Sequence, residues 1–216
     1  FHIVWGTGHG LIGHLLATLS THPKRANLTT AFGQRVEAFE VHDGRVTGCR
    51  GVSEDAGLAF AVSAGATVIT TGGVNGSIER VRQHWHSDWG SPPDVLLTGS
   101  HKYADGLLHD AAAGIGARVA HLDRNWNYAA GVHHWQPRKP HHGLSLVPPR
   151  SALWLNWRGA RIGPQPLITG FDTRELVTQV CKQERQYSWQ LLNRSIMDKE
   201  FAISGAEFNR SVRDKK

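Results

Sequence analysis

The sequence predicts an α/β fold in which a β-meander is followed by further helices and strands. Two strand-like segments lie on either side of Asp43-Gly44, and an Asp-Gly pair in this position is the strongest short-range hairpin signal. A β-branched run at 66–71 leads directly into Gly72-Gly73. Apolar residues within 11–19 recur at helical spacing. Together these observations favour mixed helix and sheet over an all-helical or all-β chain.

The first third of the chain is expected to contain a helix, then the meander, then a strand that ends at the two glycines. Asp43-Gly44 forms the first turn of the meander, and the polar segment 53–57 forms the second. In chain order we expect a strand at 1–5, a glycine loop at 6–10, a helix at 11–19, and strands at 28–32, 34–41, 45–52, 58–63 and 66–71.

The remaining elements are predicted from caps, breakers and composition. Ser77 is a favourable N-cap, Asp105 and Gly106 open a second helix, and Asp172 caps a third. Residues 123–149 are rich in Pro, His, Trp and Gly, which indicates a long, ordered but irregular segment. We therefore expect helices at 77–85, 105–116 and 172–183, and strands at 117–122, 151–157 and 187–192.

Composition limits the classes of protein. The 216 residues include 24 basic and 18 acidic side chains, for a net charge of +6, which suits a nucleic-acid binder, an anionic ligand such as a diphosphate, or an ordinary basic surface, and the scattered charges favour the last. Cys49 and Cys181 form no C-x-x-C pair, which favours free thiols and a cytoplasmic protein. No run of about twenty apolar residues occurs, so we expect no membrane span.

A metal site is not expected, although the chain has 14 histidines. Zinc sites need three or four converging ligands, often with two histidines four residues apart on a helix. No two histidines of this chain have that spacing. The histidines are therefore interpreted as surface and loop residues, and no metal-ligating residue is assigned.

The glycines at 6, 8, 10 and 13 have the spacing of a dinucleotide-binding turn. In that fold, the next strand should end in an acidic residue that binds ribose. Here the next strand instead enters the Asp43-Gly44 hairpin. We therefore interpret the glycines as a turn that starts a helix.

Three segments in a fixed order resemble a known family. They are Arg35-Val36 with Asp43-Gly44-Arg45-Val46-Thr47-Gly48-Cys49, then 66–73, then the Asp105-Gly106 helix. This pattern is similar to the flavoproteins of the succinate dehydrogenase and fumarate reductase family, in particular the ketosteroid dehydrogenase-like subgroup. The resemblance implies that 1–80 is the central part of a Rossmann-like FAD-binding domain and that 81–216 is an incomplete substrate (cap) domain.

The resemblance also implies which residues contact FAD. The backbone of Val36 would contact the adenine, and Thr71, Gly72 and Gly73 would lie against the adenosine diphosphate part. Asp105 matches a recurrent FAD contact of the family, but Ala104 replaces the glycine that precedes it there. Asp105 is therefore either an FAD ligand or only the cap of its helix.

The aromatic and basic stretch that begins at Asp123 has two interpretations. Its Trp, Tyr and Arg side chains would stack on the bases of single-stranded nucleic acid, or they would wall an apolar substrate pocket. The order Asp123-Arg-Asn-Trp-Asn-Tyr128, Gly131, Trp135, Pro137 resembles the ketosteroid dehydrogenase-like subgroup, which favours the pocket and a small apolar ligand rather than nucleic acid. Tyr128 would then donate or accept a proton beside the flavin, or serve structure alone.

Arginines raise the question of a dicarboxylate substrate. The fumarate reductase branch has a G-x-R-F-x-N-E segment, whereas this chain has Gly159-Ala-Arg-Ile-Gly-Pro-Gln165. Because Phe, Asn and Glu are all replaced, no catalytic arginine is assigned by resemblance. Arg150 and Arg174 are kept only as candidates to line the site.

The sequence thus favours an FAD-dependent oxidoreductase that dehydrogenates or reduces a C–C bond of an apolar, steroid-like substrate, with an unassigned electron acceptor. The alternative is a non-catalytic basic module that binds single-stranded nucleic acid. The chain begins at Phe1, and no strand with the N-terminal dinucleotide motif is recognised. We therefore expect an internal fragment that binds FAD weakly or not at all on its own, because the helix N-terminus that binds pyrophosphate is missing.

Overall fold

The computed structural model describes residues 7–147, 149, 151–162 and 173–203. The described residues up to Val68 form one compact unit, and those from Ile69 onward form a second. Helices and sheets occur in both, as the α/β prediction requires, and the strand pairs of the described residues are antiparallel. The division into an FAD-binding part and a cap part at residue 80 stays a prediction.

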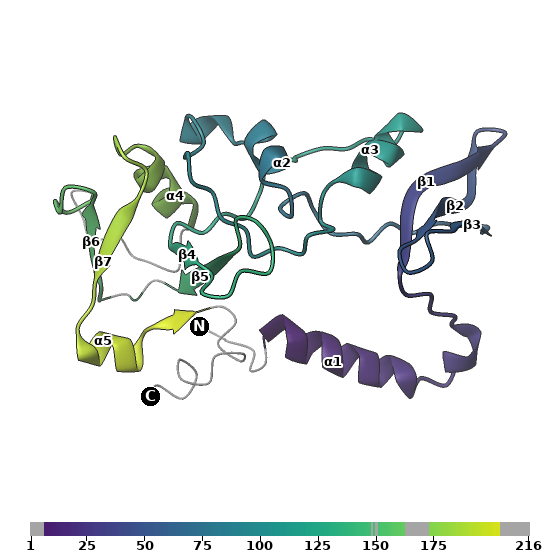
Figure 1. Ribbon diagram of the computed structural model, residues 1–216, viewed down its shortest axis with the longest axis horizontal. Helices are drawn as coiled ribbons and strands as arrows, with labels where there is room; N and C mark the ends of the chain where they lie inside the picture. The colour runs from purple at the N-terminus through teal and green to yellow at the C-terminus, as the bar shows by residue number, and fades with distance from the viewer. Residues whose placement is uncertain (1–6, 148, 150, 163–172, 204–216) are drawn as a thin grey trace. The chain divides into compact units, whose positions relative to one another are not determined.

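The first unit consists of a helix and a three-stranded meander in the order β1-β2-β3 (Figure 1). Asp43 and Gly44 have φ of 48° and 72°, the left-handed values that a two-residue hairpin turn of type I′ needs, so the predicted hairpin is confirmed. The elements are α1 (Thr7–Ser20), the 3₁₀ turn η1 (Arg25–Asn27), β1 (Gln34–His42), β2 (Arg45–Ser53) and β3 (Ala59–Ser63).

The β1–β2 ladder contains a bulge at Glu37, a second register shift between Glu40 and Val41, and one place of close strand approach. Val36 lies opposite Gly51 and Ala38 lies opposite Arg50, which leaves Glu37 without a partner of its own. A Cβ added to Gly51 would collide with the carbonyl oxygen of Arg35. The ladder therefore requires glycine at position 51 and tolerates no larger residue there without moving the backbone.

Two predictions in the first unit are wrong. The glycine loop expected at 6–10 is helical from Thr7 onward, because Gly8 and Gly10 lie inside α1. The strand expected at 28–32 is irregular, because no strand of the described residues pairs with it. The helical spacing within 11–19 is confirmed, although its five large apolar side chains are 44 to 56% exposed: Leu11, Ile12, Leu15, Leu16 and Leu19.

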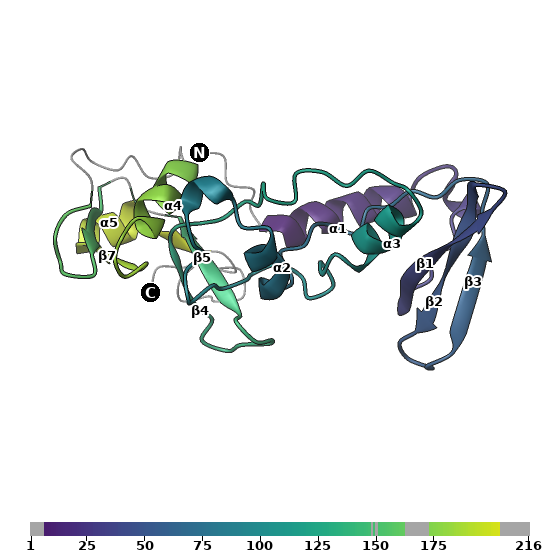
Figure 2. The ribbon, with the colours of Figure 1, turned by 90° about the horizontal axis from the view of Figure 1, so that it is seen from above.

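The second unit contains short helices and two small sheets, with strand orders β4-β5-β8 and β6-β7. Figure 2 shows β4 and β5 side by side, as their register requires. The elements are α2 (Ile78–Gln83), η2 (Ser87–Trp89), α3 (Leu107–Gly114), β4 (Gly131–His133), β5 (Gly143–Val147), β6 (Leu153–Asn156), α4 (Thr173–Cys181), β7 (Ser188–Leu191), α5 (Arg194–Lys199) and β8 (Ala202–Ile203).

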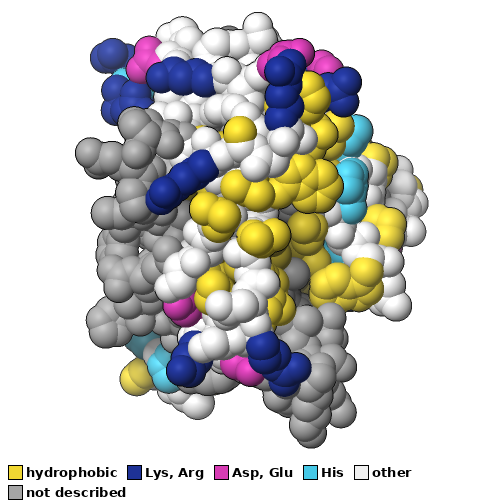
Figure 3. Space-filling view, turned by 90° about the vertical axis from the view of Figure 1, so that its left-hand side faces the viewer, with side chains coloured by type: hydrophobic (Ala, Val, Ile, Leu, Met, Phe, Trp, Pro, Cys, Tyr) yellow, Lys and Arg dark blue, Asp and Glu magenta, His cyan; other side chains and the backbone are white. Residues whose placement is uncertain are grey.

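The core of this unit forms where α4 packs against β6. Its cluster consists of five side chains that are at most 8% exposed: Ala130, Trp154, Ile162, Leu176 and Val180. The opposite face of β6 and β7 is apolar but exposed, with Leu153, Trp189 and Leu191 between 40 and 60% exposed. Figure 3 shows hydrophobic side chains gathered in a band on this side of the molecule. One face of β6 is thus packed in the core, whereas the other face of β6 and β7 is apolar but exposed.

Several helices and strands of the second unit were predicted correctly. Those at 77–85, 105–116, 151–157, 172–183 and 187–192 contain α2, α3, β6, α4 and β7. Ser77 is the N-cap of α2, and its side chain accepts a hydrogen bond from the backbone N–H of Arg80 at 3.2 Å. The strand expected at 1–5 and the cap Asp172 lie outside the described residues.

Three other predictions are wrong. Residues 66–71 and 117–122 form no strand, because a β-branched run becomes a strand only beside a partner and none of the described residues provides one. The segment 123–149 is not irregular throughout, since it contains β4 and β5.

None of the helices within the described ranges is both long and apolar enough to cross a membrane.

Candidate functional site

The predicted glycine loop presents its backbone to the surroundings. Gly72 has φ of 81°, in the left-handed region that favours glycine, and both Gly72 and Gly73 are exposed. A Cβ added to Gly73 would meet nothing closer than the Asn75 Oδ1 atom at 3.8 Å. The protein itself therefore leaves room for a side chain at Gly73, and its absence leaves the backbone open to a ligand.

Hydrogen bonds fix this loop against a neighbouring segment of the same unit. The N–H of Gly76 donates to the carbonyl oxygen of Ala104 at 2.8 Å. The hydroxyl of Thr98, a side chain that is 7% exposed, donates to the carbonyl oxygen of Asn75 at 2.6 Å. The exposed glycines are thus followed directly by a rigidly held turn.

The start of α3 lies against the same loop. Gly106 is the N-cap residue with φ of 82°, and a Cβ there would lie 3.1 Å from the Val74 Cγ1 atom. The Oδ1 atom of Asp105 accepts a hydrogen bond from the N–H of Leu107 at 3.0 Å. Asp105 therefore satisfies the first N–H group of α3 from the position before the N-cap, and because a carboxylate has about four acceptor positions, it keeps the capacity to bind a ligand hydroxyl.

An ion pair joins α2 to α3 beside this site. The guanidinium of Arg80 donates to both carboxylate oxygens of Asp110, with Nη1 to Oδ1 at 3.1 Å. This hydrogen bonding raises the pKa of Arg80 and lowers the pKa of Asp110. The two helices that follow the glycine loop and Asp105 are thereby held in one arrangement.

The other predicted FAD contacts are placed as follows. Thr71 is exposed and immediately precedes the glycine loop. Val36 lies in the first unit, on β1 opposite Gly51 and next to the bulge. Gly72, Gly73 and Asp105 thus belong to the second unit, whereas Val36 belongs to the first.

The predicted substrate-side residues lie at the surface. Tyr128 is 55% exposed and stacks on Trp126, with ring centroids 6.2 Å apart. Arg174 on α4 forms an ion pair with Asp88, with Nη2 2.9 Å from Oδ2, and its side chain is 64% exposed. Arg150 lies outside the described residues.

Sequence reasoning missed a group of buried donors after α2. Trp89 is 7% exposed, and its ring is 5.2 Å from that of Trp85. Within the part of the chain that the structure describes, the buried His84 Nε2, Trp85 Nε1 and Trp89 Nε1 atoms have no hydrogen-bond partner. Buried polar atoms are usually hydrogen-bonded, so these three atoms are unsatisfied polar groups of this segment. The sequence signal for these donors was a pair of tryptophans four residues apart, because each tryptophan ring is apolar except for its single N–H group.

The residues of this site fit FAD, whereas no metal centre is visible in them. No group of three His, Cys, Asp or Glu side chains among the described residues is arranged to hold a metal ion. The backbone at Gly72-Gly73 is open to close approach, and the Asp105 carboxylate beside it suits a hydroxyl of a bound nucleotide.

Comparison with known families decides between the two interpretations of the sequence. Residues 1–212 match the model of the FAD binding domain family. The chain belongs to this flavoprotein family, that of succinate dehydrogenase and fumarate reductase. The resemblance drawn from 35–49, 66–73 and 105–106 is confirmed, FAD is the cofactor that the family indicates, and the nucleic-acid alternative is not favoured.

Curated relatives of this flavoprotein are mycobacterial. A KsdD-like steroid dehydrogenase of Mycolicibacterium smegmatis is 35% identical over 232 residues, which cover 99% of this chain and 42% of the relative. A KsdD-like steroid dehydrogenase of Mycobacterium tuberculosis is 36% identical over 224 residues, which cover 97% of this chain and 38% of the relative. The chain thus spans about two fifths of the length of the relatives it matches.

Proposed function

We propose that this chain contributes to an FAD-dependent dehydrogenase that acts on a C–C bond of an apolar, steroid-like substrate. The observation that supports this most is the open backbone at Gly72-Gly73, held beside Asp105 in a member of an FAD-binding family. The names of the mycobacterial relatives, both steroid dehydrogenases, support the substrate class.

On this proposal the chain's own residues bind and orient the cofactor. The backbone of Thr71, Gly72 and Gly73 lies against the adenosine diphosphate part, and Asp105 accepts a hydrogen bond from a hydroxyl group. The backbone of Val36 contacts the adenine. FAD supplies the hydride acceptor when bound, while the protein supplies placement and proton transfer.

On the substrate side, the aromatic side chains supply apolar surface and donors. Trp85 and Trp89 offer Nε1–H groups that lack a partner among the described residues, which suits a carbonyl oxygen of an otherwise apolar molecule. Tyr128 is exposed and able to exchange a proton with bulk water or a ligand. Arg174 must leave Asp88 before it touches a substrate.

The glycine loop offers a test that separates cofactor binding from folding. These 216 residues would replace the matching region of the M. smegmatis relative, and bound flavin would be measured by absorbance after purification. We expect a yellow protein. Gly73→Ala should lose flavin without losing stability, because the protein leaves space there. Gly65→Ala is the matched control, because its added Cβ meets nothing within 4 Å.

Steroid-dependent reduction of an artificial dye by the chimaera would test the substrate class. The proposal predicts turnover with 3-ketosteroids and none with succinate or fumarate. A folded, cooperatively melting chimaera that contains no flavin would refute the assignment of the site. Equal flavin content in Gly73→Ala and Gly65→Ala would refute the role of the glycine loop.

A further inference from the structure

The connection between β4 and β5, residues 134–142, brings two histidine rings face to face. The ring centroids of His134 and His142 are 4.1 Å apart, and the ring planes differ by 15°. The backbone N–H of Gln136 donates to Nδ1 of His134 at 2.9 Å, and that of Arg138 donates to Nδ1 of His142 at 3.1 Å. Because each Nδ1 is an acceptor, each neutral ring has its proton on Nε2. The stacked pair therefore offers two Nε2–H donors.

The surroundings of this pair are positively charged. The connection itself contains Arg138 and Lys139, and the charges of both act on His142. A carboxylate near the connection is that of Glu79 on α2, whose pKa is lowered by hydrogen bonds within its own turn and also by the charge of His141.

Burial and neighbouring charges both act on the ionisable groups of this connection. Lys139 donates through Nζ to the carbonyl oxygen of Ser100, and burial lowers the pKa of its ammonium group. Burial also lowers the pKa of His142, and the nearby charges of His134, Lys139 and Arg138 lower it further. The neighbouring cations Lys139 and Arg138, which disfavour a proton on His142, would attract a negative ligand.

Thr98 connects this pair to the glycine loop within the same unit. Its backbone N–H donates to the carbonyl oxygen of His141 at 2.8 Å, and its carbonyl oxygen accepts from Gly143 at 3.1 Å. Its hydroxyl donates to the carbonyl oxygen of Asn75, which follows Gly72-Gly73 by two residues. Thr98 thus forms hydrogen bonds both to His141, next to the stacked pair, and to Asn75, which follows the glycine loop.

We infer that the stacked pair of His134 and His142 is a binding site for an oxyanion, namely a phosphate or diphosphate group, which accepts hydrogen bonds from the two Nε2–H donors. The same chemistry is available from the diphosphate of the flavin and from a phosphate on another molecule. The site rests on the geometry of the β4–β5 connection and does not require the proposed dehydrogenase activity.

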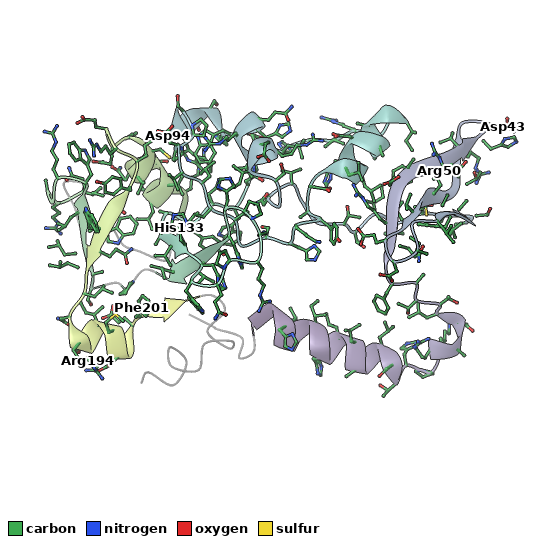
Figure 4. All side chains as sticks on the ribbon, viewed as in Figure 1. Asp43, Arg50, Asp94, His133, Arg194 and Phe201 are labelled. Carbon is green, nitrogen blue, oxygen red and sulfur yellow. The ribbon has the colours of Figure 1, made fainter. Side chains whose placement is uncertain are left out.

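The experiment is a titration of the 216-residue chain with inorganic pyrophosphate, without flavin. Ring-nitrogen NMR signals of the histidines report Nε2, and the fluorescence of Trp135, whose ring is 4.7 Å from that of His134, reports the pair independently. We expect saturable shifts at His134 and His142. His133 on β4, labelled in Figure 4, is exposed and serves as the internal reference.

Two substitutions of His142 distinguish the loss of the Nε2–H donor from a change in the folded structure. His142→Asn keeps an acceptor near the Nδ1 position, for the N–H of Arg138, but removes the Nε2–H donor. It should weaken pyrophosphate binding about tenfold, as expected for one lost charge-assisted hydrogen bond. His142→Gln, which places an amide N–H near the Nε2 position, should weaken it less. His133→Asn is the matched control and should leave the affinity unchanged.

Further ligands identify the source of the anion. Stronger competition by FAD than by riboflavin, which lacks phosphate, would assign the site to the flavin diphosphate, and equal competition would assign it to a phosphate on another molecule. Either result is compatible with the oxyanion site. Shifts reproduced by sodium chloride at matched ionic strength would overturn it. An oligonucleotide that binds the wild type more tightly than pyrophosphate, and binds His142→Asn equally well, would also overturn it.

Discussion

The meander β1–β3 and the α4–β6 region of the second unit are stabilised in different ways. Among the described residues up to Val68, Phe39 is the one buried hydrophobic side chain, at 9% exposed. The core around Trp154 and Leu176 contains five buried side chains. Backbone hydrogen bonds, a tight turn and close strand approach thus dominate the meander, whereas side-chain burial dominates the second region. The meander should be sensitive to backbone crowding, and the core to lost volume.

The largest expected effect tests the core. Leu176 on α4 is 2% exposed, so Leu176→Ala removes buried methyl groups and leaves a cavity. We expect the free energy of unfolding to fall by about 2–5 kcal/mol, measured by urea denaturation. Leu191→Ala on β7 is the matched control, because Leu191 is 60% exposed. Equal losses for the two variants would show that this core does not dominate the second unit.

The next effect tests crowding in the meander. Gly51→Ala places a Cβ against the carbonyl oxygen of Arg35, so β1 and β2 must separate locally. We expect a loss of about 1–3 kcal/mol, the usual cost of overpacking. Hydrogen exchange of the β1 and β2 amides should accelerate, while that of α4 amides should not. An unchanged exchange pattern in β1 would contradict the role assigned to close strand approach.

A smaller effect of opposite sign is expected in α1. Gly13 lies inside this helix, and a Cβ there would meet nothing within 4 Å. Gly13→Ala should stabilise the helix by up to about 1 kcal/mol, because alanine loses less backbone entropy than glycine. Circular dichroism during thermal unfolding would measure the gain. A loss of stability would show that the helix face at Gly13 packs against something.

The smallest effect concerns the pair of Arg80 and Asp110. The hydrogen bond from Arg80 depresses the folded-state pKa of Asp110, so its stabilisation is present above the unfolded pKa and is lost as pH falls through the folded pKa. Asp110→Asn should lower the melting temperature at pH 7, and the difference should vanish as the pH falls through the depressed folded-state pKa of Asp110. A double-mutant cycle with Arg80→Gln isolates the pair, and additive effects would exclude coupling.

The sequence predicts elements that local residues determine, and it fails for strands that depend on a distant partner. The β1–β2 hairpin was predictable because Asp43-Gly44 fixes the turn locally, and α2 was predictable because Ser77 caps it. The segments 66–71 and 117–122 read as strands by composition, but a strand also needs a partner, which the segment's own sequence does not specify. The strands β4 and β5 were missed because they pair with each other over only three residues, across a nine-residue connection.

The site was predictable to a similar, partial extent. Gly72, Gly73 and Asp105 were predicted through the family resemblance, and the structure places them in one unit; their contact with FAD stays a prediction. Thr98 was not found, because its importance depends on contacts with Asn75 and His141, which are far from it in the chain. The stacked rings of His134 and His142 were likewise invisible as a pair, since their stacking depends on how the β4–β5 connection folds back.

The bulge at Glu37 has a consequence for changes in chain length. Because Glu37 is the extra residue in β1, deleting it would remove this bulge and restore one-to-one pairing between Val36 and Glu40, while the second shift, between Glu40 and Val41, would remain. The same deletion would turn residues before the bulge, Val36 among them, to the other side of the sheet. A one-residue deletion that is mild for the ladder would therefore be severe for whatever contacts Val36, and a gap at this position between related chains would mark a change of ligand rather than of fold.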